Sequence, residues 1–309
     1  MEKVKKMLPK FCGFLFFGMM GTFVSAQKIS YQVNSQTGAL QTLSIANDPQ
    51  KMNWLVATDG SQYRWVKENY GWGLGYATQV KGNRKEKVSW EVPVEIKQEG
   101  NEVVYMAGDI RICVKRKMVG DELVEEYTFR NQGEDEVVLV DIGVYTPFND
   151  NYPGSRTCIN ARTNTHIWEG ENAAYINALR MGGYAPHLGL VLTKGAVKSY
   201  EIWERGRDKG NSHTRGIITL NLPDLQLMPG KEYSISWCSF AHKGIDDFRQ
   251  KLLEKGSVFV SCNKYVFEKG EKAFIELAAE NSIQKCVLKK QGIHIPMKKR
   301  GNLWIAEVK

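Results

Sequence analysis

The sequence is poor in several features that mark common classes of protein. It has six cysteines in 309 residues, and none of them forms a C-x-x-C pair, so neither a disulfide framework nor a zinc site is indicated. After residue 26 no apolar run reaches the roughly 20 residues that are needed to cross a bilayer. Between residues 27 and 240 no long segment repeats its apolar residues with a helical period. These absences exclude a disulfide-rich miniprotein, a multi-spanning membrane protein and a mainly helical domain.

The main part of the chain also lacks an excess of charge of either sign. The net charge is +8, but the basic excess lies in residues 1–26 and 256–309. Residues 27–255 carry equal numbers of basic and acidic side chains. A nucleic-acid-binding domain would show a basic surface, so no nucleic-acid partner is predicted. The basic end of the chain is interpreted as a solvated surface.

The first feature that is present is an export signal over residues 1–26. Four lysines precede an apolar run at 11–24 (FCGFLFFGMMGTFV), and Val24-Ser25-Ala26 is a small-residue cleavage site. The run is too short to cross a bilayer, so the mature chain is expected to begin near Gln27 with no membrane span. The predicted localisation is secreted or periplasmic. An uncleaved anchor is the alternative.

Residues 27–243 show apolar side chains at every second position, separated by turn residues. The first pair of predicted strands is 29–33 and 40–45, joined by the turn Ser35-Gln36-Thr37-Gly38. Further strands are predicted at 88–96, 102–106, 110–117, 121–130, 136–144, 188–193, 199–204, 217–222 and 233–240. The pattern predicts an all-β domain, a large antiparallel sandwich of two sheets packed face to face.

A short helix is predicted in the linker at 244–256, where Asp246 can cap the first amide groups and Gly256 ends the helix. Strand patterns resume at 257–309, including 258–261, 265–267, 273–277, 286–290, 293–297 and 303–308. They resemble the opening strands of an immunoglobulin-like sandwich, which needs about 100 residues, so a partial immunoglobulin-like segment is expected. The chain is therefore expected to be the front piece of a longer protein or a split gene product. A small three-hairpin module is the alternative.

Residues 146–189 differ from their surroundings, because strand alternation lapses and polar, aromatic and small residues crowd together. Long loops on a β scaffold often carry function. An aromatic ring can cover the C–H face of a sugar while Asn, Arg and carboxylate groups bind its hydroxyls. We therefore predict a saccharide site in this segment. The alternative is an ordered crossover in which Asn residues cap turns and Trp168 fills the core.

Three stretches resemble a known family: YQVNSQTGALQTLSIANDPQKMNW, NTHIWEGENAAYINALRMGGYAPHLGLVLTKG and LMPGKEYSISWCSFAHKGIDDF. They are similar to the N-terminal domain of large bacterial six-hairpin glycosidases. The resemblance implies a galactose-mutarotase-like supersandwich over about residues 28–255. In that family an immunoglobulin-like segment and an (α/α)6 toroid with the active site follow. The toroid is absent here, so a missing C-terminal domain is an expected partner.

The predicted partner is an oligosaccharide or polysaccharide, with no metal and no cofactor. The predicted carbohydrate-binding residues are His166, Trp168, Glu169, Asn172, Tyr175, Arg180 and His187. Glycoside hydrolysis needs two carboxylates about 5–9.5 Å apart, for which the candidates are Glu169, Asp150 and Glu204.

The expected function is that of an accessory or substrate-wall domain of a glycoside hydrolase. One alternative is a non-catalytic glycan-binding or structural module. Another is a mutarotase-like epimerase that uses His166 and His187 with Glu169 or Glu204. A bridge between Cys262 and Cys286 stays open.

Overall fold

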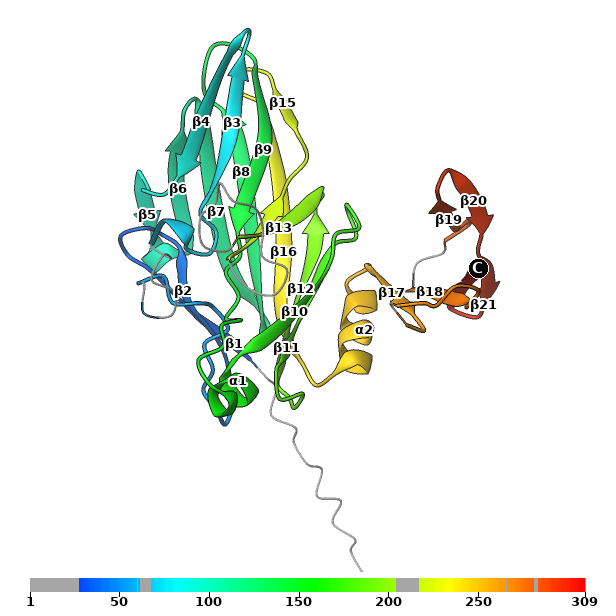
Figure 1. The fold of residues 1–309 in the computed structure, drawn as a ribbon. Helices are drawn as coiled ribbons and strands as arrows, with labels where there is room; N and C mark the ends of the chain where they lie inside the picture. The colour runs from blue at the N-terminus through cyan, green and yellow to red at the C-terminus, as the bar shows by residue number, and fades with distance from the viewer. Residues whose placement is uncertain are drawn as a thin grey trace, which may run out of the picture.

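The structure, a computed structural model, describes residues 28–59, 61, 68–203, 217–264, 266–280 and 283–308. The described chain consists mainly of antiparallel strands, with the helices α1 (Ser155–Ala161) and α2 (Ile245–Glu254) and the 3₁₀ turns η1 (Glu68–Tyr70) and η2 (Gln98–Gly100). The predicted export signal at 1–26 lies outside the described residues. Figure 1 shows a large twisted sandwich with a smaller strand segment beside it.

Two sheets form the sandwich, and every strand pair in them is antiparallel. The larger sheet has eight strands, in the order β10 (Thr163–Trp168), β11 (Tyr175–Arg180), β12 (His187–Lys194), β16 (Glu232–His242), β8 (Glu122–Asn131), β7 (Ile110–Val119), β6 (Glu102–Ala107) and β5 (Glu95–Lys97). The second has the order β13 (Ser199–Trp203), β14 (Ile217–Asn221), β9 (Val137–Tyr145), β3 (Gly75–Lys81) and β4 (Arg84–Trp90), with β15 (Leu225–Leu227) paired to β9. The predicted antiparallel all-β sandwich is confirmed.

One hydrophobic core fills the space between these sheets. Strand β8 shows why the sequence folds this way, because Leu123, Glu125, Tyr127 and Phe129 point into the core while the residues at 124, 126 and 128 turn to the other face. The core encloses a buried ion pair in which Arg116 Nε donates to Glu125 Oε1 at 3.0 Å. The indole N–H groups of two buried tryptophans also donate to the Glu125 carboxylate. This buried charge is therefore compensated by several hydrogen bonds.

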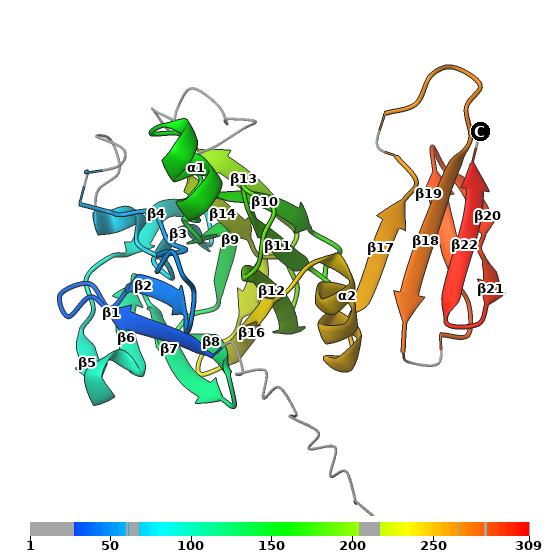
Figure 2. The ribbon, with the colours of Figure 1, turned by 90° about the horizontal axis from the view of Figure 1, so that it is seen from below.

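The hairpin of β1 (Ile29–Val33) and β2 (Leu40–Ile45) confirms the first predicted strand pair, with Ile29 opposite Ile45. Its first amide, Ile29 N, donates to Asp121 O at 2.9 Å. Ile29 and Leu43 are fully buried in the core. The hairpin therefore belongs to the sandwich, as its place against the larger sheet in Figure 2 also shows.

The prediction that strand structure lapses across 146–189 is wrong. The segment contains α1 and the complete β10–β11 hairpin, and β12 begins within it. The reason lies in β11, where five of the six residues Tyr-Ile-Asn-Ala-Leu-Arg are buried. Both faces of β11 are covered, so the polar–apolar alternation that identifies a half-buried strand is absent.

Helix α2 lies in the predicted linker and packs on the outer face of the larger sheet. Phe248 and Leu252 are buried there against Tyr175, Val191 and Phe240. The predicted cap is wrong, because Gly244 precedes the helix and no side chain caps it. The carboxylate of Asp247, the residue after the predicted cap Asp246, instead accepts a hydrogen bond from Lys243 N at 2.8 Å.

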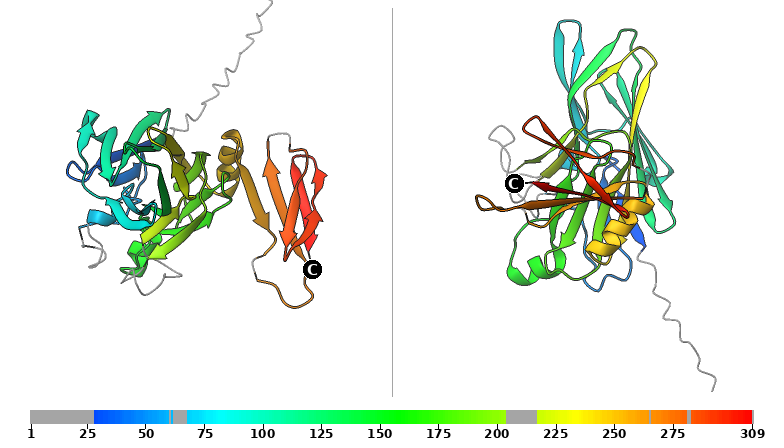
Figure 3. Two further views of the ribbon diagram at one scale, coloured as in Figure 1. Left: turned by 90° about the horizontal axis from the view of Figure 1, so that it is seen from above. Right: turned by 90° about the vertical axis from the view of Figure 1, so that its right-hand side faces the viewer.

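Beyond α2, a second strand segment stands beside the sandwich (Figure 3). Its four-stranded sheet has the order β17 (Val258–Cys262), β18 (Ala273–Ala279), β22 (Leu303–Val308) and β21 (Lys298–Arg300), and β19 (Val287–Lys290) pairs with β20 (Ile293–Pro296). The predicted strand at 265–267 is not formed at Val266 and Phe267, and Tyr265 lies outside the described residues. The division into domains and the immunoglobulin-like character of this segment stay predictions.

Three chemical features of the described residues bear on the site. The five described cysteines are all free thiols, so Cys262 and Cys286 are not bridged. No group of His, Cys, Asp and Glu in the described ranges is arranged to hold a metal ion. None of the described helices combines the length and apolarity needed to span a membrane.

Candidate functional site

The β10–β11 hairpin gathers the predicted site residues through its register. His166 lies opposite Asn177, and Trp168 lies opposite Tyr175. Residues directly opposite each other in an antiparallel pair point to the same face of the sheet. These four side chains therefore share the outer face, while Ile167 and its partner on β11 turn toward the core.

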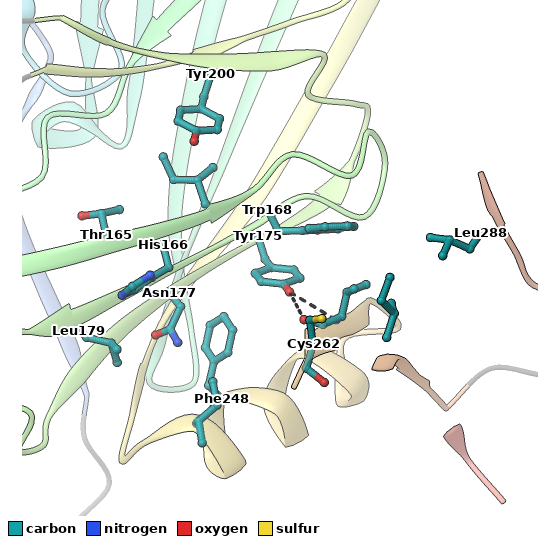
Figure 4. Close-up of a pocket in the computed structure, with 15 residues that line it drawn as sticks. Thr165, His166, Trp168, Tyr175, Asn177, Leu179, Tyr200, Phe248, Cys262 and Leu288 are labelled. Carbon is teal, nitrogen blue, oxygen red and sulfur yellow. Dashed lines mark hydrogen bonds between the residues drawn. The ribbon is translucent and has the colours of Figure 1, made fainter. Parts of the chain in front are cut away.

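This outer face forms one wall of a groove of about 690 Å³. Tyr200 of β13 stands at one end, Ile245 and Phe248 of α2 line the side, and the opposite wall comes from β17, β18 and β19. Figure 4 shows His166, Asn177 and Phe248 in line, with Tyr200 above them and Cys262 and Leu288 across the opening. The groove thus lies between the sandwich and the C-terminal strand segment.

Aromatic rings give the groove flat apolar surfaces. Trp168 is 39% exposed and Tyr200 is 38% exposed, although a large apolar ring gains free energy when it is covered. Behind Trp168, the ring of Tyr175 stacks with a centroid separation of 6.3 Å and is itself buried. Tyr175 also stacks on Phe259 of β17 at 6.1 Å, which fixes the opposite wall. Trp168 therefore presents a supported ring to the groove.

Asn177 is the least expected polar group in the groove. Its side chain is 5% exposed, and its Oδ1 is buried without a hydrogen-bond partner among the described residues. Most buried polar atoms have such a partner, and one that lacks it costs about 1–3 kcal/mol. The groove therefore holds a hydrogen-bonding group that the described protein leaves unsatisfied.

The structure does not bring all predicted site residues to the groove. His166, Trp168 and Tyr175 line it. Glu169 and Asn172 are exposed on the turn of the β10–β11 hairpin and are not among its lining residues.

The other predicted residues lie elsewhere or outside the described chain. Arg180 points inward from β11, where its guanidinium pairs with Asp48 at 2.7 Å and is shielded from solvent. Asp150 is buried at 6% exposure in the connection after β9. Glu204 lies outside the described residues. The structure thus separates the predicted carboxylates from the groove wherever it describes them.

His187 is buried beside His242, with ring centroids 5.2 Å apart, beneath α2. Its Nδ1 accepts a hydrogen bond from Arg180 N at 3.1 Å. Burial lowers the pKa of His187, and burial lowers that of His242 to about 4. Both rings are therefore neutral near pH 7 and support the helix that borders the groove.

The sequence reasoning did not select Asn177, Tyr200 or Ile245 as site residues. Alternation along 199–203 does place Tyr200 on one face of a strand, which was a usable signal. The pairing of Asn177 with His166 depends on the hairpin register, which was not predicted. The contribution of α2 and β17 depends on tertiary packing.

Comparison with known proteins gives one close structural match. The chain matches a polysaccharide lyase with 57% sequence identity and a TM-score of 0.81, over 92% of this chain and 42% of the lyase chain. No protein-family profile matches the chain, and no curated protein matches it.

Two remote matches have lower scores. A galactose mutarotase related enzyme from Lactobacillus acidophilus has 10% identity and a TM-score of 0.42, over 71% of this chain and 99% of that chain. A GH36 alpha-galactosidase from Geobacillus stearothermophilus has 11% identity and a TM-score of 0.41, over 73% of this chain and 41% of the galactosidase chain.

The chain therefore shares its fold with part of the polysaccharide lyase. This chain spans less than half of the lyase chain, although the lyase covers nearly all of this one. The predicted resemblance to the β-sandwich part of a longer carbohydrate-active enzyme is confirmed, and the chain is similar over nearly its whole length to one part of a polysaccharide lyase.

Proposed function

We propose that the groove binds a saccharide, and that the chain acts as a substrate-binding wall in polysaccharide degradation. The observation that carries the proposal is the unpaired Oδ1 of Asn177 beside the exposed ring of Trp168. A pyranose offers hydroxyls to such an amide and an apolar C–H face to such a ring. The name of the 57%-identical match, a polysaccharide lyase, supports the same class of ligand.

The composition of the groove favours binding over hydrolysis by this chain. Its described lining residues include His166, Asn177 and Tyr200 but no Asp or Glu. A glycosidase pair would need two carboxylates across the bond. For the whole protein we propose polysaccharide cleavage, with lyase chemistry favoured over hydrolysis by the name of the match.

The epimerase alternative receives less support. It requires a histidine acid and a carboxylate base on either side of one sugar ring. His166 is exposed at the groove, whereas His187 is buried beneath α2 and is held by Arg180 N. Glu169 lies on the hairpin turn, outside the groove lining.

We retain the predicted export of the chain as part of the proposal, since a polymeric substrate is met outside the cell.

Replacement of Trp168 tests the proposal. Trp168→Ala removes the exposed ring, and we expect binding of the recognised oligosaccharide to weaken about tenfold, because packing against an aromatic ring contributes about 0.5–1.5 kcal/mol beyond the area that it buries. The measurement is isothermal titration calorimetry against a panel of oligosaccharides, with the melting temperature recorded for each variant. Melting should change little, because the ring is 39% exposed.

Phe274→Ala is the matched control, since Phe274 is a 41% exposed aromatic residue on β18. Its neighbour Ile275 lines the groove, so alternation directs Phe274 away from it. Equal loss of affinity in the two variants, or unchanged affinity in Trp168→Ala, would contradict the proposal.

A further inference from the structure

The described lining of the groove contains no permanently charged side chain. Its polar groups are supplied by Thr165, His166, Asn177, Tyr200 and Ser261, and the rest of the surface is mainly aromatic and aliphatic. A site for a carboxylated or sulfated sugar normally provides Arg or Lys, because a buried anion without a counter-charge is strongly disfavoured. Neither residue type is found among the described side chains of this groove.

Three basic residues close to the groove in sequence pair with acidic side chains. Arg180, three residues after Asn177, points to the opposite face and pairs with Asp48. On α2, Arg249 pairs with Asp246 at 3.0 Å. At the end of this helix, Lys255 pairs with Glu122. These guanidinium and ammonium groups are therefore not available to an anion in the groove.

Acidic residues follow the two main groove-lining elements. Glu169 and Glu171 come directly after Trp168 and are exposed on the hairpin turn. Asp246 and Asp247 come directly after Ile245, in the first turn of α2. They also offset the positive end of this helix, which would otherwise attract an anion. Lys243 before Ile245, and Lys289 and Lys290 after Leu288, are exposed as well. The rim therefore carries charges of both signs, and the lining between them is neutral.

We infer that the groove selects a neutral pyranose unit and discriminates against uronate and sulfated units. This inference rests on the proposed saccharide-binding function and specifies its ligand class. Trp168 and Tyr200 cover the C–H faces of the sugar, and the amide of Asn177 binds its hydroxyls. In a polymer that also contains acidic units, the groove holds a neutral unit, and the acidic units lie outside it.

The test compares neutral and acidic oligosaccharides of equal length. The probes are the hexasaccharides of β-1,4-glucan, β-1,4-xylan and β-1,4-mannan, set against hexameric oligoglucuronate and oligogalacturonate, titrated calorimetrically into the full chain. We expect at least one neutral probe to bind about tenfold more tightly than either uronate. Its affinity should change less than about twofold between roughly 50 and 500 mM NaCl, because no ion pair is formed.

A charge-introducing pair of variants locates the selectivity. Ile245→Lys places a cation at the groove, and Ile293→Lys makes the same change on β20, where no groove lining is affected. Both sites are tolerant, since Ile245 is 52% and Ile293 is 64% exposed. Uronate affinity should rise several-fold in Ile245→Lys, in a salt-dependent manner, and should stay at the wild-type level in Ile293→Lys.

Two outcomes overturn the inference, and a third concerns the function on which it rests. Wild-type protein that binds a uronate more tightly than every neutral probe, with affinity that falls steeply in salt, contradicts neutral selectivity. Equal gains in the two lysine variants would show that net charge and not the groove controls uronate binding. Absence of binding by both classes of probe would instead refute the proposed saccharide-binding function.

Discussion

Asn177 shows at the level of one residue how a site can be recognised by what it leaves unsatisfied. Its side chain lies in a sheet strand with both faces covered, yet its Oδ1 has no partner in the described structure. An unsatisfied buried amide lowers stability, whereas an apolar group of similar shape would not. Other buried polar atoms of the described chain also lack a partner, but Asn177 lies in the lining of the groove, where a bound sugar could supply one.

Asn177→Leu should therefore separate stability from binding. We expect the free energy of unfolding to be unchanged or to rise by up to about 1 kcal/mol, because an unsatisfied amide is removed. We expect saccharide binding to be lost. Urea unfolding followed by tryptophan fluorescence measures the first quantity, and titration calorimetry the second.

Asn131→Leu is the control for the same substitution at a satisfied site. The amide of Asn131 is fully buried, donates to Asp135 O and Leu227 O, and accepts from Gly133 N. Its replacement should cost about 2–4 kcal/mol. If Asn177→Leu destabilises the protein as strongly as Asn131→Leu, the amide of Asn177 is a structural group and its assignment to the site is wrong.

Only some of the residues at the groove could be predicted from the sequence. Composition drew attention to Trp168 and His166, because a crowded polar and aromatic stretch is unusual on a β scaffold. The structure places both side chains in the groove lining, and their role in binding a sugar stays a prediction. The same reasoning selected Arg180 and His187, which the structure buries. Both side chains are polar, but whether they point into the core or toward the groove depends on the strand register and on the elements that pack over β11. The residue type does not reveal either.

At the scale of helices and strands, α2 packs over a pair of buried histidines. His187 and His242 lie under it, and the His242 ring is 5.0 Å from that of Phe248. His242 Nδ1 lies 3.1 Å from Gly244 O, and its Nε2 is buried without a described partner. Neutral rings fit this place, and protonated rings do not.

Stability should therefore fall as the pH falls across this pair. Both histidines have folded-state pKa values below the ordinary 6.5, that of His242 being about 4. The unfolded chain takes up protons from pH 6.5 downward while the folded chain resists, so the contribution is complete above pH 6.5 and is lost between pH 6.5 and about 4. Besides burial, the positive charge of Arg180 lowers the pKa of His187, whereas the negative charge of Asp247 opposes the lowering of the His242 pKa.

His242→Phe tests this dependence, since it keeps an aromatic ring against Phe240 and Phe248. The wild-type free energy of unfolding should drop between pH 7 and pH 5 by about 1–2 kcal/mol more than that of the variant. Urea titrations at the two pH values give the difference. Identical pH dependence in wild type and variant would show that His242 is not the titrating group.

Alternation along the sequence located some strands and not others. It predicted β1, β2, β7 and β8 because their apolar and polar residues alternate. It missed β3 and β10, and it also missed β11, where both faces are covered, and α1, whose seven residues include no buried side chain. The strand predicted at 88–96 joins the end of β4 to the start of β5, which the structure separates. The predicted helix near 248–253 was found as α2, but its capping residue was wrong because the chain enters through Gly244.

For the whole molecule, burial is distributed unevenly between the sandwich and the C-terminal segment. The sandwich core contains fully buried large residues such as Trp54, Trp90 and Phe129. Beyond residue 257 the buried apolar residues that the structure describes are Ala278, Ala279, Met297 and Ala306. Regions with less buried apolar surface unfold at lower free energy.

Calorimetric unfolding should therefore show two transitions, the first from the C-terminal segment. Ala306→Asp places a charge at a site that is 3% exposed, and it should lower the first transition by several degrees without moving the second. Differential scanning calorimetry gives both temperatures. A single transition that the variant shifts as a whole would mean that the two parts unfold as one unit.

The architecture was predictable at this scale because period-two patterns, short turns and the family resemblance agreed on an antiparallel sandwich. The groove was not predictable, because it lies where β10 and β11 meet α2 and β17, elements up to about 100 residues apart. No local pattern encodes such a meeting. The division of the chain at 244–256 stays a prediction, and the structure has α2 at Ile245–Glu254 between the two strand regions.

The position of β16 has a consequence for how the chain is made. It lies between β12 and β8 in the larger sheet, although it follows both in sequence and spans Glu232–His242. Until the ribosome has released this stretch, a nascent chain holds two sheet fragments whose facing edges lack their common neighbour. Completion of the sandwich therefore waits for its last strand, and the edge of β8 stays unpaired from the synthesis of Asn131 until β16 has emerged.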